Sequence, residues 1–503
     1  MLKAKLKKES ISKSLKSLNI KNFFNDDHIS YKRTAPKFPN SILSELPYDY
    51  YDQDKKLFHN LLACADEKKY EETCGFILNA YLKSGISRED IKILSDFFNS
   101  ALPENSIVQI INYSSPRYRD LFDNWMKNKE KEGGIYTRLA QKRVDFFNKG
   151  AWDSFFDEPL TIKDYNLYIC VSISKKIKNY DQKLISLREK LINKLKNINL
   201  FVNNSNPEIL LSFLDEILNP SRKKFRKSNI KWDKLNTISS SLVAGSDSTI
   251  VSEKDKIILR DTIEARSFTV SSYPDFWAAF NTIELSGSED NSQLRLNCPS
   301  IISLTLKISN QEKQKTSIIA RKSVLSNRFN SKARSLWTGI EEQYKDYKYV
   351  SDKIEKSDNK IFQSKFDIIL MSPKENLEKE TEKLISIYKT KNWKIIQNDY
   401  VHLPSFLSTL PFYTSLERFD KFSKLGKTKK IISWTSTNIA PMQGEYRGNA
   451  MDDPYLILFG KRGQPIFWNP FTSAEGGNFN MATTGQPGSG KSVISQEIAM
   501  AVR

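Results

Sequence analysis

Apolar residues change their spacing repeatedly between Leu46 and about Trp277. Some stretches have the short apolar runs of strands, and others repeat an apolar residue every three or four positions, as helices do. We expect strands at Leu57–Cys64, Cys74–Tyr81, Ser106–Tyr113 and Tyr165–Ser174, and helices at Ser87–Leu102, Tyr118–Lys129, Tyr136–Asn148 and Lys183–Leu200. Strands and helices that alternate in this order favour an α+β or α/β domain.

The same periodicities continue in the second half of the chain. An apolar run over Ser300–Ile308 follows the Asn-Cys-Pro turn at 297–299 and predicts a strand. The polar stretch from Asn310 to about Lys356 predicts one or two long helices. Further expected elements are a strand at Lys365–Met371, a helix at Pro373–Lys391, a strand at Trp393–Gln397, and a hairpin of Tyr455–Phe459 with Gln464–Trp468.

Residues 485–492 (GQPGSGKS) fit the phosphate-loop pattern G-x-x-x-x-G-K-[ST]. The preceding stretch Asn478–Thr484 predicts a short strand, and Ile494, Ile498 and Ala501 recur at helical spacing after the octet. Strand, glycine loop and helix together are the context in which this pattern indicates a nucleotide site. The alternative is a Gly/Ser turn that contains Lys-Ser by chance.

The residue types in the octet suit a triphosphate. Glycines let the backbone turn tightly and approach the phosphates, while the following helix directs free N–H groups and its positive dipole end at them. Lys491 would contact the β- and γ-phosphates, and the hydroxyl of Ser492 would bind Mg²⁺. The predicted ATP-binding residues are Gly485, Gly488, Ser489, Gly490, Lys491 and Ser492.

Composition indicates a folded protein and argues against several classes of protein and site. An apolar fraction of 39% supports packed cores, and no apolar run approaches the roughly 20 residues that cross a bilayer. The start of the chain has no uninterrupted apolar core, so we expect no secretory signal and a cytoplasmic protein. The cysteines and histidines are scattered without CxxC or HxxxH pairs, which favours reduced, buried thiols over a zinc site or disulfides.

The formal net charge is +19, from 78 basic and 59 acidic residues. Such an excess suits a phosphate-bearing partner, nucleic acid or an anionic membrane, but an AT-rich coding sequence, which enriches Lys, Asn and Ile, would also produce it. Residues 1–24 could form a basic amphipathic helix on a membrane, or a frayed or partner-docked arm. Residues 219–234, with Phe225 and Trp232, could bind nucleic acid or form an exposed loop.

Several segments, in order along the chain, resemble the TraC family of conjugative-transfer ATPases, the F-type branch of the type IV secretion assembly ATPases. The segments are Leu46–Tyr50, Pro274–Trp277, Cys298–Ile301, Phe406–Phe412, Thr437–Met442, Asn478–Met481 and the phosphate loop. The resemblance implies an N-terminal α+β region that contacts inner-membrane channel proteins of the secretion system, followed by a RecA-like motor. It also implies oligomers, often hexamers, at the cytoplasmic face of the inner membrane that hydrolyse ATP to power pilus assembly and transfer of DNA or protein.

We therefore expect an α+β N-terminal region followed by the start of an α/β RecA-like P-loop ATPase domain. The expected divisions are a basic arm and linker at 1–45, an α+β domain at 46–295, an α+β module with long helices at 296–430, and the start of the motor domain at 431–503. The family's Walker B aspartate, catalytic glutamate and arginine finger would lie beyond Arg503. We thus expect an incomplete motor, no catalytic residue in this chain, and residues from about 475 onward that pack poorly and bind nucleotide weakly or not at all.

Three functions remain open at this point. The chain is the ATP-binding N-terminal part of a secretion motor, a DNA-translocase fragment that binds nucleic acid through its basic stretches, or a non-catalytic adaptor that pairs with an intact copy.

Overall fold

The computed structural model describes residues 42–63, 70–154, 159–243, 250–260, 262–331, 339–356, 359–472 and 479–502. Its strands are β1 (Tyr48–Asp52), β2 (Leu57–Ala63), β3 (Tyr70–Tyr81), β4 (Ser106–Ser115), β5 (Asp164–Ser174), β6 (Asn203–Asn204), β7 (Val251–Ser252), β8 (Ile257–Ile258), β9 (Ile263–Ser272), β10 (Ser300–Ile308), β11 (Ile361–Pro373), β12 (Lys394–Gln397), β13 (Lys429–Ile432), β14 (Leu456–Phe459) and β15 (Pro465–Trp468). Its α-helices are α2 (Arg88–Ser100), α3 (Asp123–Glu132), α4 (Gly134–Lys149), α5 (Tyr180–Asn197), α6 (Pro207–Leu218), α7 (Gln311–Phe329), α8 (Ile340–Lys356), α9 (Leu377–Thr390), α10 (His402–Leu407), α11 (Leu416–Lys424), α12 (Ser433–Ile439) and α13 (Lys491–Val502).

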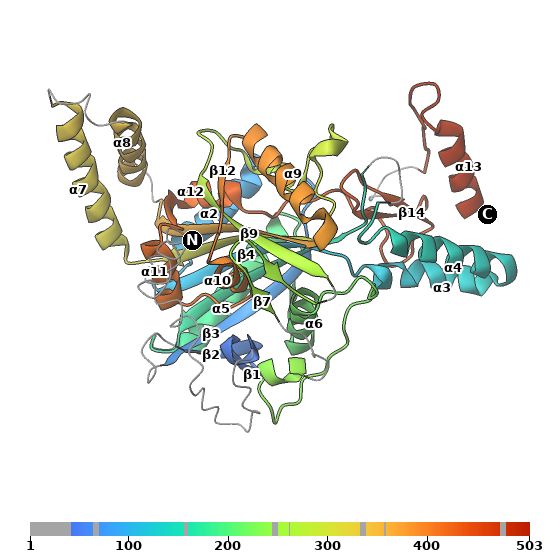
Figure 1. Cartoon of the computed structure of the whole chain (residues 1–503), viewed down its shortest axis with the longest axis horizontal. Coiled ribbons are helices and arrows are strands. Elements are labelled where there is room, and N and C mark those ends of the chain that lie inside the picture. Colours follow the sequence, from blue (N-terminus) through green and yellow to red (C-terminus); the bar gives the residue numbers. More distant parts are fainter. Residues whose placement is uncertain are drawn as a thin grey trace, which may run out of the picture.

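One large antiparallel sheet forms the centre of the molecule (Figure 1). Its strand order is β1-β2-β3-β5-β4-β10-β11-β9-β8-β7, with β6, β12 and β13 attached to β3, β9 and β11. The central strand β10 pairs along its whole length with β4 on one side and with β11 on the other. Strands from both predicted segments, 46–295 and 296–430, therefore lie in the same sheet.

Helices cover both faces of this sheet, so the central strands are buried on both sides. Along β5, Leu167, Ile169 and Val171 belong to one core, whereas Tyr168 and Cys170 belong to the other. The first core includes apolar side chains of α2, α5 and α9, and the second includes those of α4, α6 and α10. Burial on both faces explains why apolar residues stand at successive positions of such a strand rather than at every second one.

The α+β class is confirmed, and most predicted elements are present within a few residues of their expected bounds. The strand over Ser300–Ile308 agrees at both ends, and the polar stretch from Asn310 forms the helical pair α7 and α8, which projects at the left of Figure 1. Cys74, Cys170 and Cys298 are free and buried, as predicted. Cys64 and the predicted helix at 1–24 lie outside the described residues.

A polar layer is buried on one face of the sheet, where β9, β10 and β11 meet α10. Lys365 forms an ion pair with Asp367, whose other oxygen accepts a hydrogen bond from Thr269 Oγ1 at 2.7 Å. At the edge of this layer, the backbone N–H of Ser267 donates to Nδ1 of His402 at 3.1 Å. Nδ1 must be unprotonated to accept that bond, so the fold holds His402 as a neutral imidazole.

This arrangement predicts a loss of stability in mild acid. Burial lowers the pKa of His402 to about 4, whereas an unfolded histidine titrates near 6.5. A lowered folded pKa gives stability that is complete above pH 6.5 and is lost as the pH falls towards 4, here by about 3 kcal/mol. Urea unfolding curves measured between pH 7 and pH 4 should show this loss, and His402→Gln should show a smaller one. If the free energy of unfolding of His402→Gln falls with pH as steeply as that of the wild type, the assignment to His402 is refuted.

Candidate nucleotide-binding site

The octet 485–492 forms an exposed turn that leads directly into α13. Gly488 and Gly490 have φ angles of 78° and 84°, which are left-handed values that favour glycine. The backbone N–H of Ser489 donates to Gln486 O at 3.2 Å and closes the turn. Gly488 and Gly490 of the motif therefore occupy the two positions of the turn with positive φ angles, which glycine adopts most easily.

The strand predicted over Asn478–Thr484 is wrong for the residues described, because 479–484 have no regular structure and are exposed. A strand gains its stability from hydrogen bonds to a neighbouring strand, and no described strand lies beside this segment. The octet thus has the helix that its pattern predicts but not the preceding strand.

Lys491 is the first residue of α13, and its side chain turns back over the loop. Its Nζ donates to the backbone oxygens of Gly485 at 2.9 Å and Gln486 at 2.7 Å. The ammonium group is therefore held above the peptide groups of the turn, close to the free N–H groups that begin the helix. A cation beside the N-terminal end of a helix forms a site for an anion rather than for a cation.

The space around the loop also suits a bound phosphate chain. A Cβ added at Gly488 or Gly490 would meet no atom within 4 Å, so the backbone there is open to a ligand. A Cβ at Gly485 would lie 2.6 Å from Ser489 Oγ, so this glycine permits the loop to fold back on itself. Ser492 is exposed at the start of α13, next to Lys491.

The loop's helix lies against a helical pair that projects from the molecule at the right of Figure 1. We call this pair, α3 with α4, the arm. Arg143 of α4 forms an ion pair with Glu497 of α13. Residues 143 and 497 were not predicted as site residues, because nothing in the sequence links two charges 354 positions apart.

In the basic segment 219–234, both arginines and Lys227 pair with carboxylates of the same chain. Arg222 pairs with Asp153 and Glu375, and Arg226 pairs with Asp120 and Asp123 at 2.5 and 2.7 Å. Lys227 lies 3.1 Å from Asp164. The two aromatic residues of the segment are half-buried against the core beside the sheet. These side chains stabilise the packing of the segment.

The described ranges contain no group of three or more His, Cys, Asp or Glu residues placed to hold a metal ion. No helix among them has the length and apolar character needed to span a membrane.

Comparison with known proteins identifies the family. A family model described as TraC protein matches residues 42–414, most of the chain. Protein TraC of Escherichia coli (strain K12) is 20% identical over 501 residues, an alignment that covers 93% of this chain. That alignment covers 56% of the E. coli protein, so the chain spans about half the length of this relative. On the strength of the family match, the chain belongs to the TraC family.

Proposed function

We propose that this chain is an ATP-binding component of a conjugative type IV secretion system, and that residues 485–492 bind the triphosphate of Mg-ATP. The observation that carries the proposal is the turn with two left-handed glycines that places Lys491 at the first position of α13. Membership of the TraC family supports the setting in conjugative transfer.

The loop backbone, Lys491 and Ser492 each have a part in this proposal. The loop's N–H groups and the N-terminal end of α13 would surround the phosphates, and Lys491 would exchange its two carbonyl partners for phosphate oxygens. Ser492 would supply one ligand to Mg²⁺, which when bound neutralises charge on the β- and γ-phosphates. The described part of the octet and α13 supplies these binding groups and no carboxylate beside the loop for hydrolysis; Glu497 is paired with Arg143.

A titration of the full chain with a fluorescent ATP analogue tests this proposal. We expect saturable binding that ATP competes away and that EDTA weakens, because Ser492 would help to hold the Mg²⁺ that neutralises charge on the phosphates. Ser492→Ala should lose most of the Mg²⁺ dependence, about tenfold in affinity, since one metal ligand is removed. The matched control is Ser495→Ala, an exposed serine further along α13, which should retain it. Binding that is indifferent to both Mg²⁺ and Ser492 would reject this site.

The wider setting is also a proposal. We propose that the chain associates with channel proteins at the cytoplasmic face of the inner membrane and with further copies of itself, as its family membership suggests. Direct binding of nucleic acid is a weaker proposal, because the arginines of the 219–234 segment are paired with carboxylates of the same chain.

A further inference from the structure

The contact between α13 and the arm is built around Arg143. Its guanidinium carbon lies 5.9 Å from the ring centroid of Trp125 on α3 and 5.7 Å from that of Phe147 on α4. Both rings are buried, so they limit the positions that the guanidinium can adopt. From this position Arg143 forms its ion pair with Glu497, two turns into α13. The contacts with these two rings of the arm therefore hold the Arg143 side chain in the position from which it reaches Glu497.

The arm itself is tied to the segment that precedes the octet. Trp125 Nε1 donates to Tyr455 O at 3.1 Å, and Asn128 Nδ2 donates to Asp453 Oδ1 at 2.7 Å. Phe147 also packs edge-on against Phe459 of β14, with ring centroids 4.8 Å apart. The same two helices thus hold the hairpin β14–β15 and, through Arg143, the helix that follows the hairpin in the chain.

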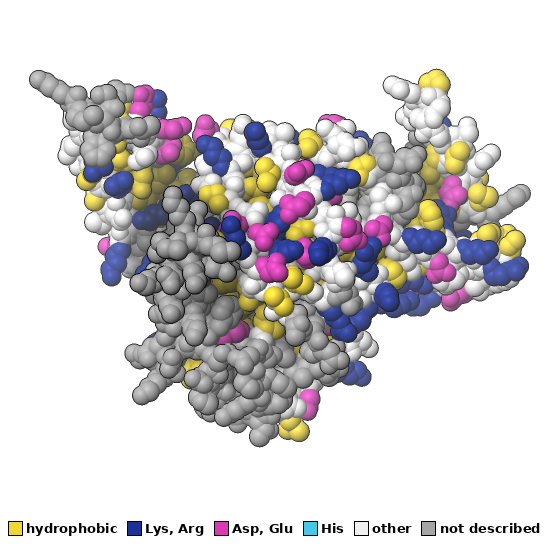
Figure 2. All heavy atoms as spheres, in the orientation of Figure 1, with side chains coloured by type: hydrophobic (Ala, Val, Ile, Leu, Met, Phe, Trp, Pro, Cys, Tyr) yellow, Lys and Arg dark blue, Asp and Glu magenta, His cyan; other side chains and the backbone are white. Residues whose placement is uncertain are grey.

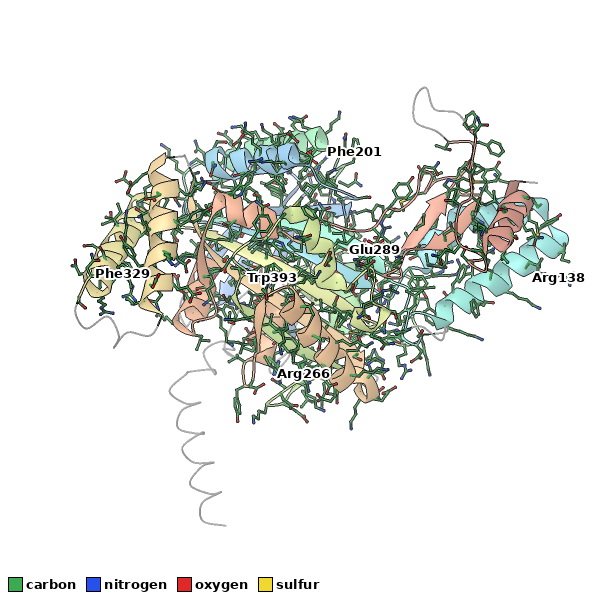
Figure 3. The ribbon with its side chains drawn as sticks, turned by 90° about the horizontal axis from the view of Figure 1, so that it is seen from above. Arg138, Phe201, Arg266, Glu289, Phe329 and Trp393 are labelled. Atoms are coloured by element: carbon green, nitrogen blue, oxygen red, sulfur yellow. The ribbon has the colours of Figure 1, made fainter. Side chains whose placement is uncertain are left out.

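The two sides of α13 differ in burial. Ile494, Glu497 and Ile498 are partly buried and share one helical face by their spacing, whereas Val493 and Met500 on the other side are 70% and 64% exposed. In both Figure 1 and Figure 3, α13 lies beside the arm, away from the sheet. Figure 2 shows Lys and Arg side chains along the arm, which suits an acidic partner such as Glu497.

From these contacts we infer that the arm seats the phosphate-loop helix and that Arg143 is the positioning residue of the nucleotide site. Lys491 and Ser492 are the first residues of α13, so a shift or rotation of this helix moves both groups relative to the loop glycines. The pair of Arg143 and Glu497 restrains that movement and links the site to Trp125 and the hairpin. The role in nucleotide binding rests on the function proposed above.

Charge reversal tests the seating directly. In Arg143→Glu and in Glu497→Arg, like charges face each other, so peptides from 491–502 should exchange amide hydrogen faster without nucleotide. Affinity for the fluorescent ATP analogue with Mg²⁺ should fall by up to about fivefold in each, the range of an ion pair whose side chains are 34% and 29% exposed. The double variant, which restores opposite charges, should recover both properties. Arg138→Glu is the matched control, because Arg138 is exposed on the same helix near the tip of the arm (Figure 3).

The two readouts separate this inference from the proposed function. Unchanged exchange at 491–502 in the single variants, or no recovery in the double variant, would overturn the seating by Arg143 whether or not nucleotide binds. If exchange changes as expected but the wild-type chain does not bind the analogue, the nucleotide proposal fails and the seating stands. A thermal midpoint equal to that of the wild type in all four variants shows that the effect is local to α13.

Discussion

Lys491→Ala should reduce affinity for Mg-ATP by about 100-fold, to the limit of detection if wild-type binding is weak. The ammonium group lies over the turn, held by the carbonyl oxygens of Gly485 and Gln486, and it is the cation of the octet. Charge-assisted hydrogen bonds to phosphate contribute about 1.5–3 kcal/mol each, and alanine removes the whole group. Equilibrium titration with the fluorescent analogue measures the loss.

The control for this variant is Lys196→Ala, an exposed lysine near the end of α5. It lowers the net positive charge by the same amount but lies on a helix that packs on the sheet. The control should bind as the wild type does. Wild-type affinity in Lys491→Ala would show that the octet is a turn that resembles a phosphate loop without acting as one.

Asp164→Ala should destabilise the chain by about 3–5 kcal/mol, the cost of leaving buried charge unpaired. Asp164 is fully buried at the start of β5 and accepts from Arg447 Nη2, and Lys227 Nζ lies 3.1 Å from its other oxygen. Burial alone would raise the pKa of Asp164, but Lys227 and Arg447 outweigh it and hold that pKa well below the usual range. This carboxylate therefore joins the sheet, the 219–234 segment and the segment before β14.

Urea unfolding followed by circular dichroism measures this change, and Asp181→Ala is the control, because Asp181 forms an exposed pair with Lys55. Such a surface pair contributes little to stability, because solvent screens both charges. The sign of the pH effect follows from the lowered pKa. The contribution of Asp164 is present above about pH 4, the range of an unfolded aspartate, and is lost as the pH falls below it. Equal losses of unfolding free energy in Asp164→Ala and Asp181→Ala would contradict the prediction that the buried Asp164 contributes more than a surface carboxylate.

The sequence predicted local structure well where one periodic segment also had a clear boundary. The Asn-Cys-Pro turn before Ser300 marks the start of β10, and the run that follows is apolar or small except for Lys307. Helix α6 was missed although Asn206 caps it and Pro207 stands at its first position, so a signal for it existed. Strand β9 was missed because it contains charged residues such as Glu264 and Arg266. These residues are buried in the structure, but their type does not predict a buried strand.

The candidate site also had parts that local sequence predicted and parts that it did not. The left-handed glycines and the helix after them follow from the local pattern, so the octet was predictable. The strand before the octet was wrong because strand formation depends on a neighbour that the local pattern does not reveal. The seat of α13 could not be predicted at all, since Arg143 and Glu497 come together only through tertiary packing.

The pairing of β4 with β10 has a consequence for how the chain emerges from the ribosome. Ser114 and Ser300, neighbours across this pairing, are 186 residues apart in the chain. At a synthesis rate of about 5–20 residues per second, β4 would wait roughly 10–40 s for its partner. Throughout that interval an apolar strand would present unpaired N–H and C=O groups on one side. The nascent chain therefore has a period of exposure to misassembly in which a holding chaperone would improve its yield.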